Sequence, residues 1–474
     1  MASMNQVERA GGVPAAPQSL FGSPVQIVGA ALLSALVVGV VLAHSAQLGI
    51  ALLIAVLFLP LALLNLPVAI ALSVPLVFLE QWPGASRVPA GVAILLALAW
   101  FGTVGGRRTL FAEILRRHRG MYLALLGLMT WITLSLLWSQ DPGVGAGALY
   151  VWYWAAAIVL VVPTVLSTRR HVVIVCAGFI VGALITVAIS IPQLSSGSPS
   201  DYATRLGGSV INPNYFAAAL LSTAALAAGL IAISRRRLHR RLLMVAFAVA
   251  AVATVATGSR GGLIAGVFMV VAAFAMMRGQ RLRLGGIIAV GLILGAVWIS
   301  SSDTTLSRLR DFNASGTGRT DIWTVAVRMW EDHPIVGVGF MNFPEESRNY
   351  ILQPGEISSE FIIDEPKETH NAYLGLLAEN GIIGLALFAI VVIALMRATW
   401  QAVRRFEEAD DPAYASLGRA ILIAQIGALA ALLFTHNTYN HTLWILLALG
   451  PVLITVAERT LPNPEPVSEL AERT

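Results

Sequence analysis

The sequence predicts an all-α protein, a polytopic transmembrane helical bundle of about 12–14 spans with one large loop outside the membrane. Of its 474 residues, 57% are hydrophobic and 12% are charged, whereas soluble domains carry about 25% charged residues. The hydrophobic residues recur in runs of about 17 to 25, the length that crosses a hydrocarbon core. Because the backbone of such a run must pair its own polar groups, each run is expected to be a helix.

About fourteen hydrophobic runs are candidate spans. The two runs within 47–80 are short, and only Leu64-Asn65-Leu66-Pro67 separates them, so a count of twelve or thirteen is also open. The runs cover residues 25–43, 47–63, 66–80, 90–105, 120–138, 146–166, 171–192, 214–233, 241–257, 262–277, 284–300, 372–396, 416–434 and 441–457.

These runs divide the chain into five expected parts. A polar N-terminal tail lacks a convincing cleavage site and leads into a retained first span. The only cysteine, Cys176, lies inside a run, where it is expected to be a small buried hydrophobe and no disulfide framework is possible. The parts are the tail 1–24, the helices of 25–300, the large outward loop 301–371, the helices of 372–457 and the tail 458–474.

Arginine-rich segments set the expected orientation, because short cytoplasmic loops are enriched in Lys and Arg. Five such segments alternate with the runs so that all fall on one side, which we predict to be the cytoplasm together with both termini. This distribution explains the net charge of +5 without nucleic acid as a partner; the expected surroundings are membrane lipid. The segments are 107–120, 168–170, 235–241, 278–283 and 397–405.

The loop 301–371 is the only predicted extramembrane piece large enough to have internal structure. A helix is predicted from Arg319 to Asp332, on the membrane surface or capping the bundle, and HPIVGVGFMNF (333–343) should follow it as a glycine-rich turn. The apolar stripe of this helix comprises Ile322, Trp323, Ala326, Val327, Met329 and Trp330.

With this topology, a short set of polar residues faces outward and could line one vestibule. His436 and His441 also fall on that side, where they are interpreted as interfacial residues. No pattern of metal ligands, such as HExxH or a Cys/His cluster, is present, so neither a metal nor a cofactor is predicted. The set comprises Arg205, Asn214, Arg260, Arg319, His370, Asn371 and Tyr373.

Two interpretations are open for the three arginines. Arg260 lies between two hydrophobic runs on the side that positive charge avoids, and its flanking glycines would let backbone and ligand approach closely. It either snorkels to the interface or presents a guanidinium fork to an anionic headgroup such as a diphosphate. Arg319 and Arg205 leave the same choice between a ligand contact and a solvated or anchoring role.

His370 stands where the long loop re-enters the membrane, followed by Asn371 and Tyr373. A histidine at a loop-to-helix junction is often a cap or a satisfied polar residue. Histidine is also the side chain best suited to accept a proton near neutral pH. A base beside several arginines would suit transfer onto a hydroxyl from a diphosphate leaving group.

Four motifs in this order give the chain a resemblance to the O-antigen ligase and polymerase superfamily of bacterial membrane glycosyltransferases. RLGGSVINPNYFA resembles the upstream partner of these motifs, and the similarity covers about residues 200–450. The motifs are TGSRGG (257–262), GRTDIW (318–323), HPIVGVGFMNF (333–343) and HNAYLGLLAENGIIGL (370–385).

The resemblance implies a fold like that of other lipid-linked-sugar glycosyltransferases, and an inverting, metal-independent transfer at the outer face of the bacterial inner membrane. The donor would be a glycan on undecaprenyl diphosphate, and the acceptor a glycan or glycolipid. By motif, Arg260 and Arg319 would hold the diphosphate and His370 would activate or position the acceptor hydroxyl. Arg205 is a weaker match, because the upstream arginine of the family is less tightly spaced.

Three functions stay open from the sequence. The first is ligation of a lipid-linked polymer to an acceptor such as a lipid A core sugar, and the second is polymerisation of lipid-linked repeat units, which the motifs do not distinguish. The third is transport of a glycolipid or an anion, which predicts charged residues near span centres and internal repeats. The spans are nearly free of charge, with Glu379 as the exception, and no repeat is evident.

Overall fold

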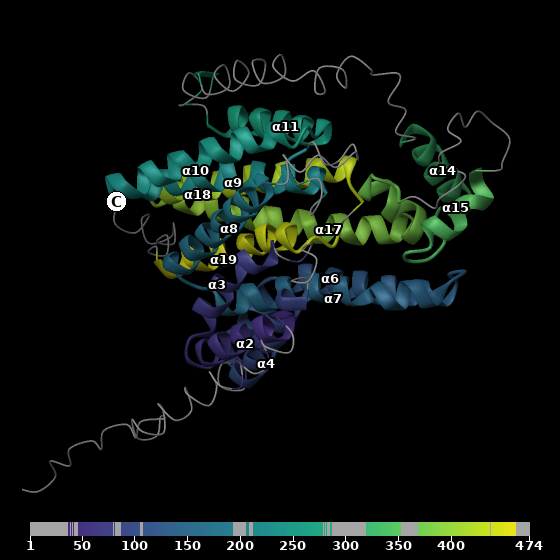
Figure 1. The fold of residues 1–474 in the computed structure, drawn as a ribbon, viewed down its shortest axis with the longest axis horizontal. Helices are drawn as coiled ribbons and strands as arrows, with labels where there is room; N and C mark the ends of the chain where they lie inside the picture. The colour runs from purple at the N-terminus through teal and green to yellow at the C-terminus, as the bar shows by residue number, and fades with distance from the viewer. Residues whose placement is uncertain are drawn as a thin grey trace, which may run out of the picture. The chain divides into compact units, whose positions relative to one another are not determined.

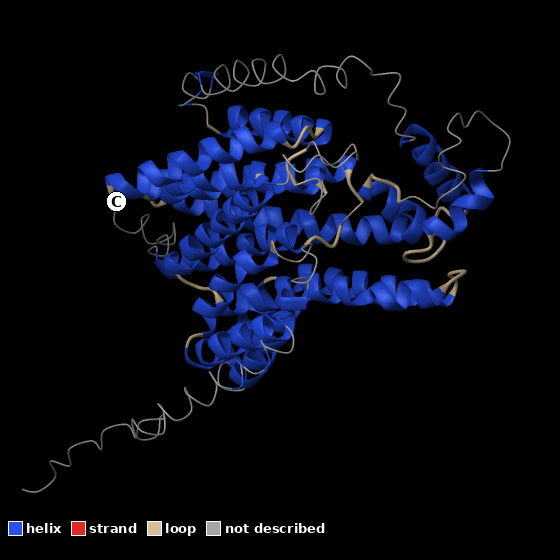
Figure 2. Ribbon diagram, in the orientation of Figure 1, coloured by secondary structure: helices blue, strands red, loops and turns tan. Residues whose placement is uncertain are grey.

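The computed structural model is built from helices wherever it describes the chain (Figure 2). It describes residues 46–78, 87–104, 108–192, 205–207, 212–277, 319–351, 368–436 and 438–460, with a few isolated positions between them. The chain divides into two compact units, Met1–Leu57 and Phe58–Thr474, and all features discussed below except the first part of α2 lie in the second. The predicted all-α fold is confirmed for these residues.

The predicted spans coincide with helices at every run that lies in the described ranges. Runs 25–43 and 284–300 lie outside them, as do most of the N-terminal tail and much of the loop 301–371. The helices are α2 (Ala46–Leu64), α3 (Leu66–Val77), α4 (Arg87–Val104), α5 (Arg108–Arg117), α6 (Arg119–Leu134), α7 (Pro142–Val165), α8 (Arg169–Ser190), α9 (Pro213–Ile233), α10 (Arg237–Ala256), α11 (Arg260–Met276), α14 (Arg319–Asp332), α15 (Phe343–Ile351), α17 (Ala372–Glu408), α18 (Pro412–Ala431) and α19 (His441–Thr460), with short 3-10 turns η1 (Ser135–Leu137) and η4 (Leu432–Phe434).

Eight of the described helices are long and apolar enough to cross a membrane, and four apolar helices are shorter. The break predicted between 47 and 80 occurs at Asn65, whose side chain accepts a hydrogen bond from the Val68 amide and caps α3. Because eight described helices are long and apolar enough to cross a membrane, the chain is a multi-pass membrane protein. The full count of spans stays a prediction.

The centre of the bundle is formed by α17, α18 and α19 with α9. Helix α9 packs against α10 and α18, and these three run side by side in Figure 1. Helices α6 and α7 pack against α17 and α19 respectively. Close approach of backbones, which drives helix association in lipid, is seen at Gly450 of α19, where an added Cβ would lie 2.3 Å from the Leu395 carbonyl oxygen of α17.

One buried polar side chain links three helices within this centre. Gln425 of α18 is fully buried, and its amide nitrogen donates to Thr399 Oγ1 of α17 at 3.0 Å and to the Leu446 carbonyl of α19 at 2.8 Å. A polar group in an apolar bundle is tolerated when it is hydrogen-bonded in this way. These bonds tie α17, α18 and α19 to one another.

Helix α17 is broken at Gly381, which has φ +64° and non-helical backbone geometry. The preceding loop lies against this break, because the Ile382 amide donates to the Pro334 carbonyl at 3.0 Å. A Cβ on Gly381 would lie 2.1 Å from the Ile335 carbonyl oxygen. Only glycine combines this backbone conformation with this close approach.

The predicted glycine-rich turn 333–343 docks on the first part of α17. The amides of Val338 and Gly339 donate to the carbonyls of Ala378 and Glu379 at 3.0 and 2.8 Å. A Cβ on Gly337, which has φ +69°, would overlap the Glu379 backbone. Two of the sequence motifs therefore form one structural unit.

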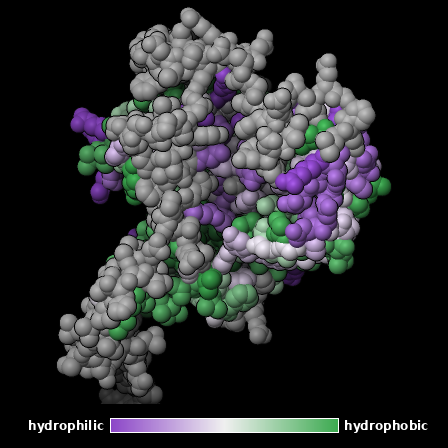
Figure 3. Space-filling view, turned by 45° about the vertical axis from the view of Figure 1, so that its right-hand side comes forward, coloured by the Kyte–Doolittle hydropathy of each residue, from purple (hydrophilic) through white to green (hydrophobic). Residues whose placement is uncertain are grey.

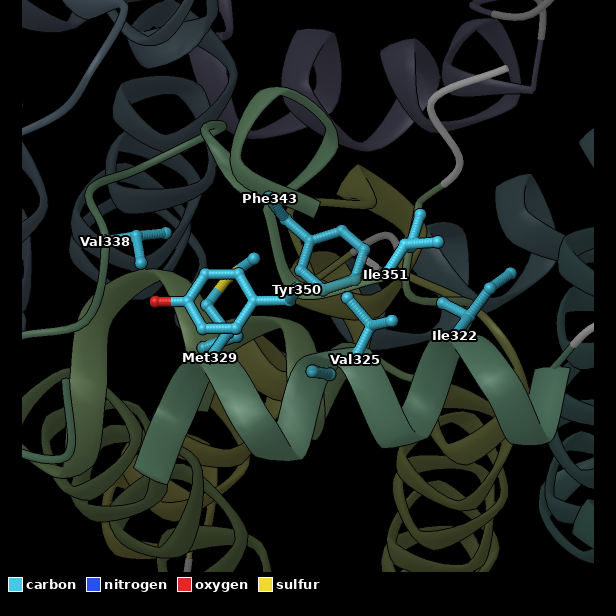
Figure 4. Packing of buried hydrophobic residues seen from close by; sticks show 9 residues of the cluster. Ile322, Val325, Met329, Val338, Phe343, Tyr350 and Ile351 are labelled. Atoms are coloured by element: carbon cyan, nitrogen blue, oxygen red, sulfur yellow. The ribbon is translucent and has the colours of Figure 1, made fainter. Parts of the chain in front are cut away.

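The helix predicted from Arg319 to Asp332 is confirmed as α14, with the same ends. It packs on α15 and α17, so the described part of the loop covers the start of α17. Figure 4 shows Ile322, Val325 and Met329 of α14 facing the side chains of Phe343 and Tyr350. This apolar core is closed by Ala378 and Leu374 of α17 and makes the loop part of the bundle.

Three arginine-rich segments meet at the end of the bundle formed by the last turns of α17 and α19. Arg117 pairs with Glu458, and Arg169 pairs with Asp411 at 2.8 Å while its guanidinium lies 4.2 Å from the Tyr414 ring centroid. Two of these segments were expected to be loops and are helical. Residues 108–117 form the amphipathic α5, and 397–405 continue α17, because apolar residues recur at helical spacing among the arginines.

Candidate functional site

Arg205 is held against the turn that joins α10 to α11. Its Nε donates to the Thr257 carbonyl at 2.8 Å, and the next amide, that of Leu206, donates to the Ala256 carbonyl at 3.1 Å. Gly258 adopts φ +59°, and the Arg205 side chain lies over it. Arg205 therefore lies against the turn that immediately precedes Arg260.

The first turns of α9 and α11 are joined by a hydrogen bond between their polar residues. Ser259 is buried, and its hydroxyl donates to Asn214 Oδ1 at 2.6 Å while accepting from the Gly262 amide at 3.0 Å, which caps α11. Arg260 is the first residue of α11 and is half-buried. Arg205, Asn214 and Arg260 therefore share one end of the bundle.

The glycines that flank Arg260 serve helix packing. A Cβ on Gly261 would lie 2.5 Å from Phe434 Cβ, and one on Gly262 would lie 2.6 Å from Ala217 Cβ. We expected these glycines to let backbone and ligand approach closely. The close neighbours at both positions are protein side chains of η4 and α9. The glycines bring α11 close enough to α9 for the Ser259 contact to form.

A second group of polar residues connects this corner to His370. The Tyr215 hydroxyl lies 2.9 Å from Nδ1 of His436, and the Glu368 carboxylate pairs with Nε2 of His436. The rings of His436 and His370 meet edge to face with centroids 5.8 Å apart. His370 is thus part of a contact network that begins at Asn214, the neighbour of Tyr215.

His370 has a backbone conformation that non-glycine residues rarely adopt, with φ +48°. The residues beside it hold this conformation: the Thr369 hydroxyl donates to the Asn371 carbonyl at 2.9 Å, and the Trp323 indole donates to the Thr369 carbonyl at 3.0 Å. Trp323 lies one turn after Arg319 in α14. The start of α14 is therefore tied to the backbone that presents His370.

The other two candidates beside His370 use their polar atoms inside the protein. Asn371 is buried, and its Oδ1 accepts from the amides of Tyr373 and Leu374, so it caps α17. The Tyr373 hydroxyl donates to the Leu429 carbonyl of α18 at 2.8 Å. These contacts are suited to positioning the start of α17.

Sequence reasoning missed three residues of this network: Tyr215, Glu368 and His436. His436 was interpreted as interfacial, but it contacts both His370 and residues of α9. The signal available in the sequence was proximity to motifs, since Tyr215 follows Asn214 and Glu368 lies two residues before His370. Nothing in the spacing linked His436 to His370 or Tyr215, which lie 66 and 221 positions earlier in the chain.

Two helix N-termini and two arginines come together at this corner. Helices α9 and α11 both begin here, and helix N-termini carry a partial positive charge and free amide donors that favour anions. The side chains of Arg205 and Arg260 add two full charges. Figure 3 shows hydrophilic side chains gathered on the face that carries α14 and α15, in contrast to the hydrophobic flanks of the helices.

Comparison with protein families finds one match within the chain. Residues 245–389 match the family model described as O-antigen ligase, which supports the resemblance drawn from the motifs. The matched range includes Ser259, Arg260, Arg319 and His370, and it ends in α17.

Comparison with individual proteins adds little. A comparison with curated proteins finds no match. A solved chain from work described as "Structural coordination of polymerization and crosslinking by a peptidoglycan synthase complex" is 16% identical, with a TM-score of 0.39 and coverage of 72% of this chain and 98% of that chain. At this identity and TM-score, the likeness carries no inference about function.

Proposed function

Because residues 245–389 match the O-antigen ligase family, we propose that the chain is a membrane glycosyltransferase that moves a glycan from undecaprenyl diphosphate to an acceptor hydroxyl. The observation that carries this proposal is the contact network from Asn214 and Ser259 through Tyr215 and His436 to His370. The network links the corner that carries Arg205 and Arg260 to the base His370. Its residues come from the starts of α9 and α11 and from the segments that follow η4 and precede α17.

The arginine-rich corner is suited to the leaving group. Arg260 is the first residue of α11, Arg205 lies against the turn before it, and Arg319 begins the helix whose Trp323 holds the His370 loop. Guanidinium groups bind phosphate oxygens in bidentate geometry. In the proposed reaction they stabilise the negative charge that develops on the diphosphate as it departs, which is the largest electrostatic demand of the transition state.

His370 is suited to the acceptor. The acceptor oxygen attacks the anomeric carbon as His370 Nδ1 or Nε2 takes its proton, the new C–O bond forms, and the bond to the diphosphate breaks with both electrons leaving on the phosphate oxygen. Attack from the face opposite the leaving group inverts the configuration. The contacts of Glu368 and Tyr215 with His436 support a fixed ring beside His370.

The proposal includes the cellular position of the site. The corner lies at the end of the bundle opposite Arg117 and Arg169, whose surroundings are rich in arginine. Under the rule that places arginine-rich loops in the cytoplasm, the site faces outward from the inner membrane and both termini are cytoplasmic. Cysteine accessibility at Glu368→Cys and Glu458→Cys, each in a Cys176→Ala background, tests this orientation.

The experiment that tests the activity uses His370→Ala and Arg260→Lys in purified full-length protein with a lipid-linked saccharide donor. His370→Ala should abolish transfer and keep donor binding, whereas Arg260→Lys should weaken donor binding because lysine cannot form a bidentate contact. Arg348→Lys, an exposed arginine of α15, is the matched control. Full transfer by His370→Ala would refute the mechanism, and transfer should persist in EDTA.

Ligation and polymerisation are separated by the glycolipids of a deletion strain. Loss of a ligase leaves long lipid-linked chains, whereas loss of a polymerase leaves single lipid-linked repeats. We propose ligation as the activity, with polymerisation as the outcome that replaces it if single repeats accumulate.

A further inference from the structure

An apolar cavity of about 140 Å³ lies between α3, α4, α7 and α19. The residues of α7 that line it recur at helical spacing from Tyr150 to Leu166, which caps the helix. At about 1.5 Å per residue this stripe is about 24 Å long, which exceeds the depth of one leaflet of hydrocarbon, about 15 Å. The cavity is therefore deep enough to hold a lipid chain along its length.

Small side chains line the cavity on both α4 and α7. Helix α4 packs against α3, and near its end the Trp100 indole donates to Thr164 Oγ1 of α7 at 3.0 Å. Nearer to the start of α4, the lining side chains are Ala93 and Ala97, and Ala157 lines the cavity from α7. The two helices are therefore joined at one end and separated by the cavity along part of their length.

The polar groups of the lining lie toward the end of the bundle that carries His370. His441 begins α19 there, and its Nδ1 lies 2.7 Å from a carboxyl oxygen of Glu80. Tyr150, two turns into α7, is largely exposed. The other hydroxyl of the lining, that of Ser73, donates to a carbonyl of its own helix at 2.7 Å. The cavity is thus apolar along its length and polar at one end.

The rest of the lining selects an apolar occupant. Apart from these groups and the Trp154 indole, one turn after Tyr150, the side chains that line the cavity are hydrocarbon. A hydrocarbon-lined cavity of about 150 Å³ stays dry and takes up apolar molecules, because its walls otherwise lack contacts. The apolar molecules that surround a multi-pass membrane protein are lipids. The expected occupant is therefore a lipid chain whose headgroup lies at the His441 end.

A short turn links this cavity to the candidate site. At one end of the turn, His436 contacts Tyr215 of α9, and its ring meets that of His370 at a centroid distance of 5.8 Å. At the other end, His441 lines the cavity. Because five residues span at most about 18 Å, a lipid held at His441 can bring a sugar of its headgroup to His370.

The cavity lies among different helices from the corner proposed for the donor. Arg205 lies against the turn before α11, and Arg260 begins α11. No residue of α9, α10 or α11 is among the described residues that line the cavity. Since the diphosphate of the donor is assigned to that corner, a lipid in the cavity is best explained as the second substrate.

We propose that this cavity holds one hydrocarbon chain of a lipid-anchored acceptor and thereby keeps the acceptor sugar near His370. This inference rests on the proposed function, and it names the acceptor as a glycolipid whose reacting sugar is attached close to its chains. Donor and acceptor are then held by separate groups of helices, and the turn from His436 to His441 lies between them.

The first measurement is photolabelling of the full-length protein in lipid nanodiscs. The probe is a lipid A core glycolipid with a diazirine on one acyl chain, and mass spectrometry maps the labelled residues. Ala97→Phe fills the cavity from α4, and Ala157→Phe fills it from α7. The matched control is Leu98→Phe, which places the same ring at the next residue of α4, where the side chain is 64% exposed. Thermal melting verifies that each variant is folded.

We expect label on residues 154–161 in wild type and in Leu98→Phe. Labelling should be about fivefold lower in the two cavity variants, because the new ring fills the void that the chain occupied. An excess of phosphatidylethanolamine should not compete with the probe. Equal labelling in both cavity variants, or loss of label to that phospholipid, would overturn the proposal, the second by showing an ordinary lipid site.

The second measurement is the KM of each substrate in the transfer reaction. In Ala97→Phe the KM for the core glycolipid should rise about fivefold, whereas the KM for the lipid-linked donor and for the same core saccharide without lipid should stay at the wild-type value. A raised KM for the donor would assign the chain to the donor and overturn the proposal. Absence of transfer by wild type would refute the proposed function, and the labelling would still decide whether the cavity binds the glycolipid chain.

Discussion

The break in α17 gives a prediction whose size follows from the structure. Gly381→Ala forces a side chain onto a residue with φ +64° and places its Cβ 2.1 Å from the Ile335 carbonyl oxygen. The left-handed conformation costs about 1–2 kcal/mol for a residue with a Cβ. Relief of the overlap by moving packed backbone costs about 1–3 kcal/mol more. We expect the free energy of unfolding to fall by about 2–5 kcal/mol.

The assay is reversible denaturant unfolding in detergent, combined with hydrogen exchange of residues 333–343 and 378–382. The control is Gly120→Ala in α6, where a Cβ meets nothing within 4 Å and the effect should be neutral or stabilising by about 0.5–1 kcal/mol. Exchange should rise in both segments only in Gly381→Ala. A loss below about 1 kcal/mol with unchanged exchange would refute the role assigned to the break.

Three further predictions concern the site and its surroundings. His436→Phe keeps a ring beside His370 and removes the contacts to Tyr215 and Glu368; kcat for transfer should fall about 10- to 100-fold through misplacement of His370, and an unchanged kcat would contradict this. Ser259→Ala removes the cap of α11 and the bond to Asn214, so the free energy of unfolding should fall by about 1–2 kcal/mol. The control Ser416→Ala, at a half-buried serine whose hydroxyl bonds to the Pro412 carbonyl within its own helix, should have a smaller effect. Burial lowers the pKa of His118 to about 4, and the Arg117 charge adds to the effect. Because the folded pKa lies below the unfolded one, the contribution to the free energy of unfolding is full above pH 6.5 and falls toward pH 4, by about 1–2 kcal/mol after allowance for partial exposure. A His118→Gln variant that keeps this pH dependence would show the assignment to be wrong.

The sequence was sufficient to predict the long apolar helices, because hydrophobic length alone decides that a segment spans a bilayer. It did not predict the short polar helices α5 and α15. It predicted α14 with the same ends, since the apolar stripe of an amphipathic helix is a local feature. It did not predict that α17 continues to Glu408 or breaks at Gly381. The break depends on backbone contacts with residues 334 and 335, which no local pattern encodes.

The candidate site was also predicted only in part. Arg205, Asn214, Arg260 and His370 were found from motifs and topology, and the contact network brings them to one end of the bundle. His436 was missed because its partners come from α9 and from the loop before α17, and only tertiary packing brings these together. The glycines beside Arg260 indicated a close approach but not which group approaches, and the neighbours are Phe434 and Ala217.

The docking of residues 333–343 on α17 limits how the protein can be divided. The amides of Val338 and Gly339 depend on carbonyls of Ala378 and Glu379, and the apolar core of α14 and α15 is closed by α17. An excised loop would lose these partners and should not fold alone as a water-soluble fragment. A chain cut between 351 and 368 leaves each side of this contact intact, one on each piece. Two co-expressed pieces that end and begin at that cut should therefore reassemble without a covalent link.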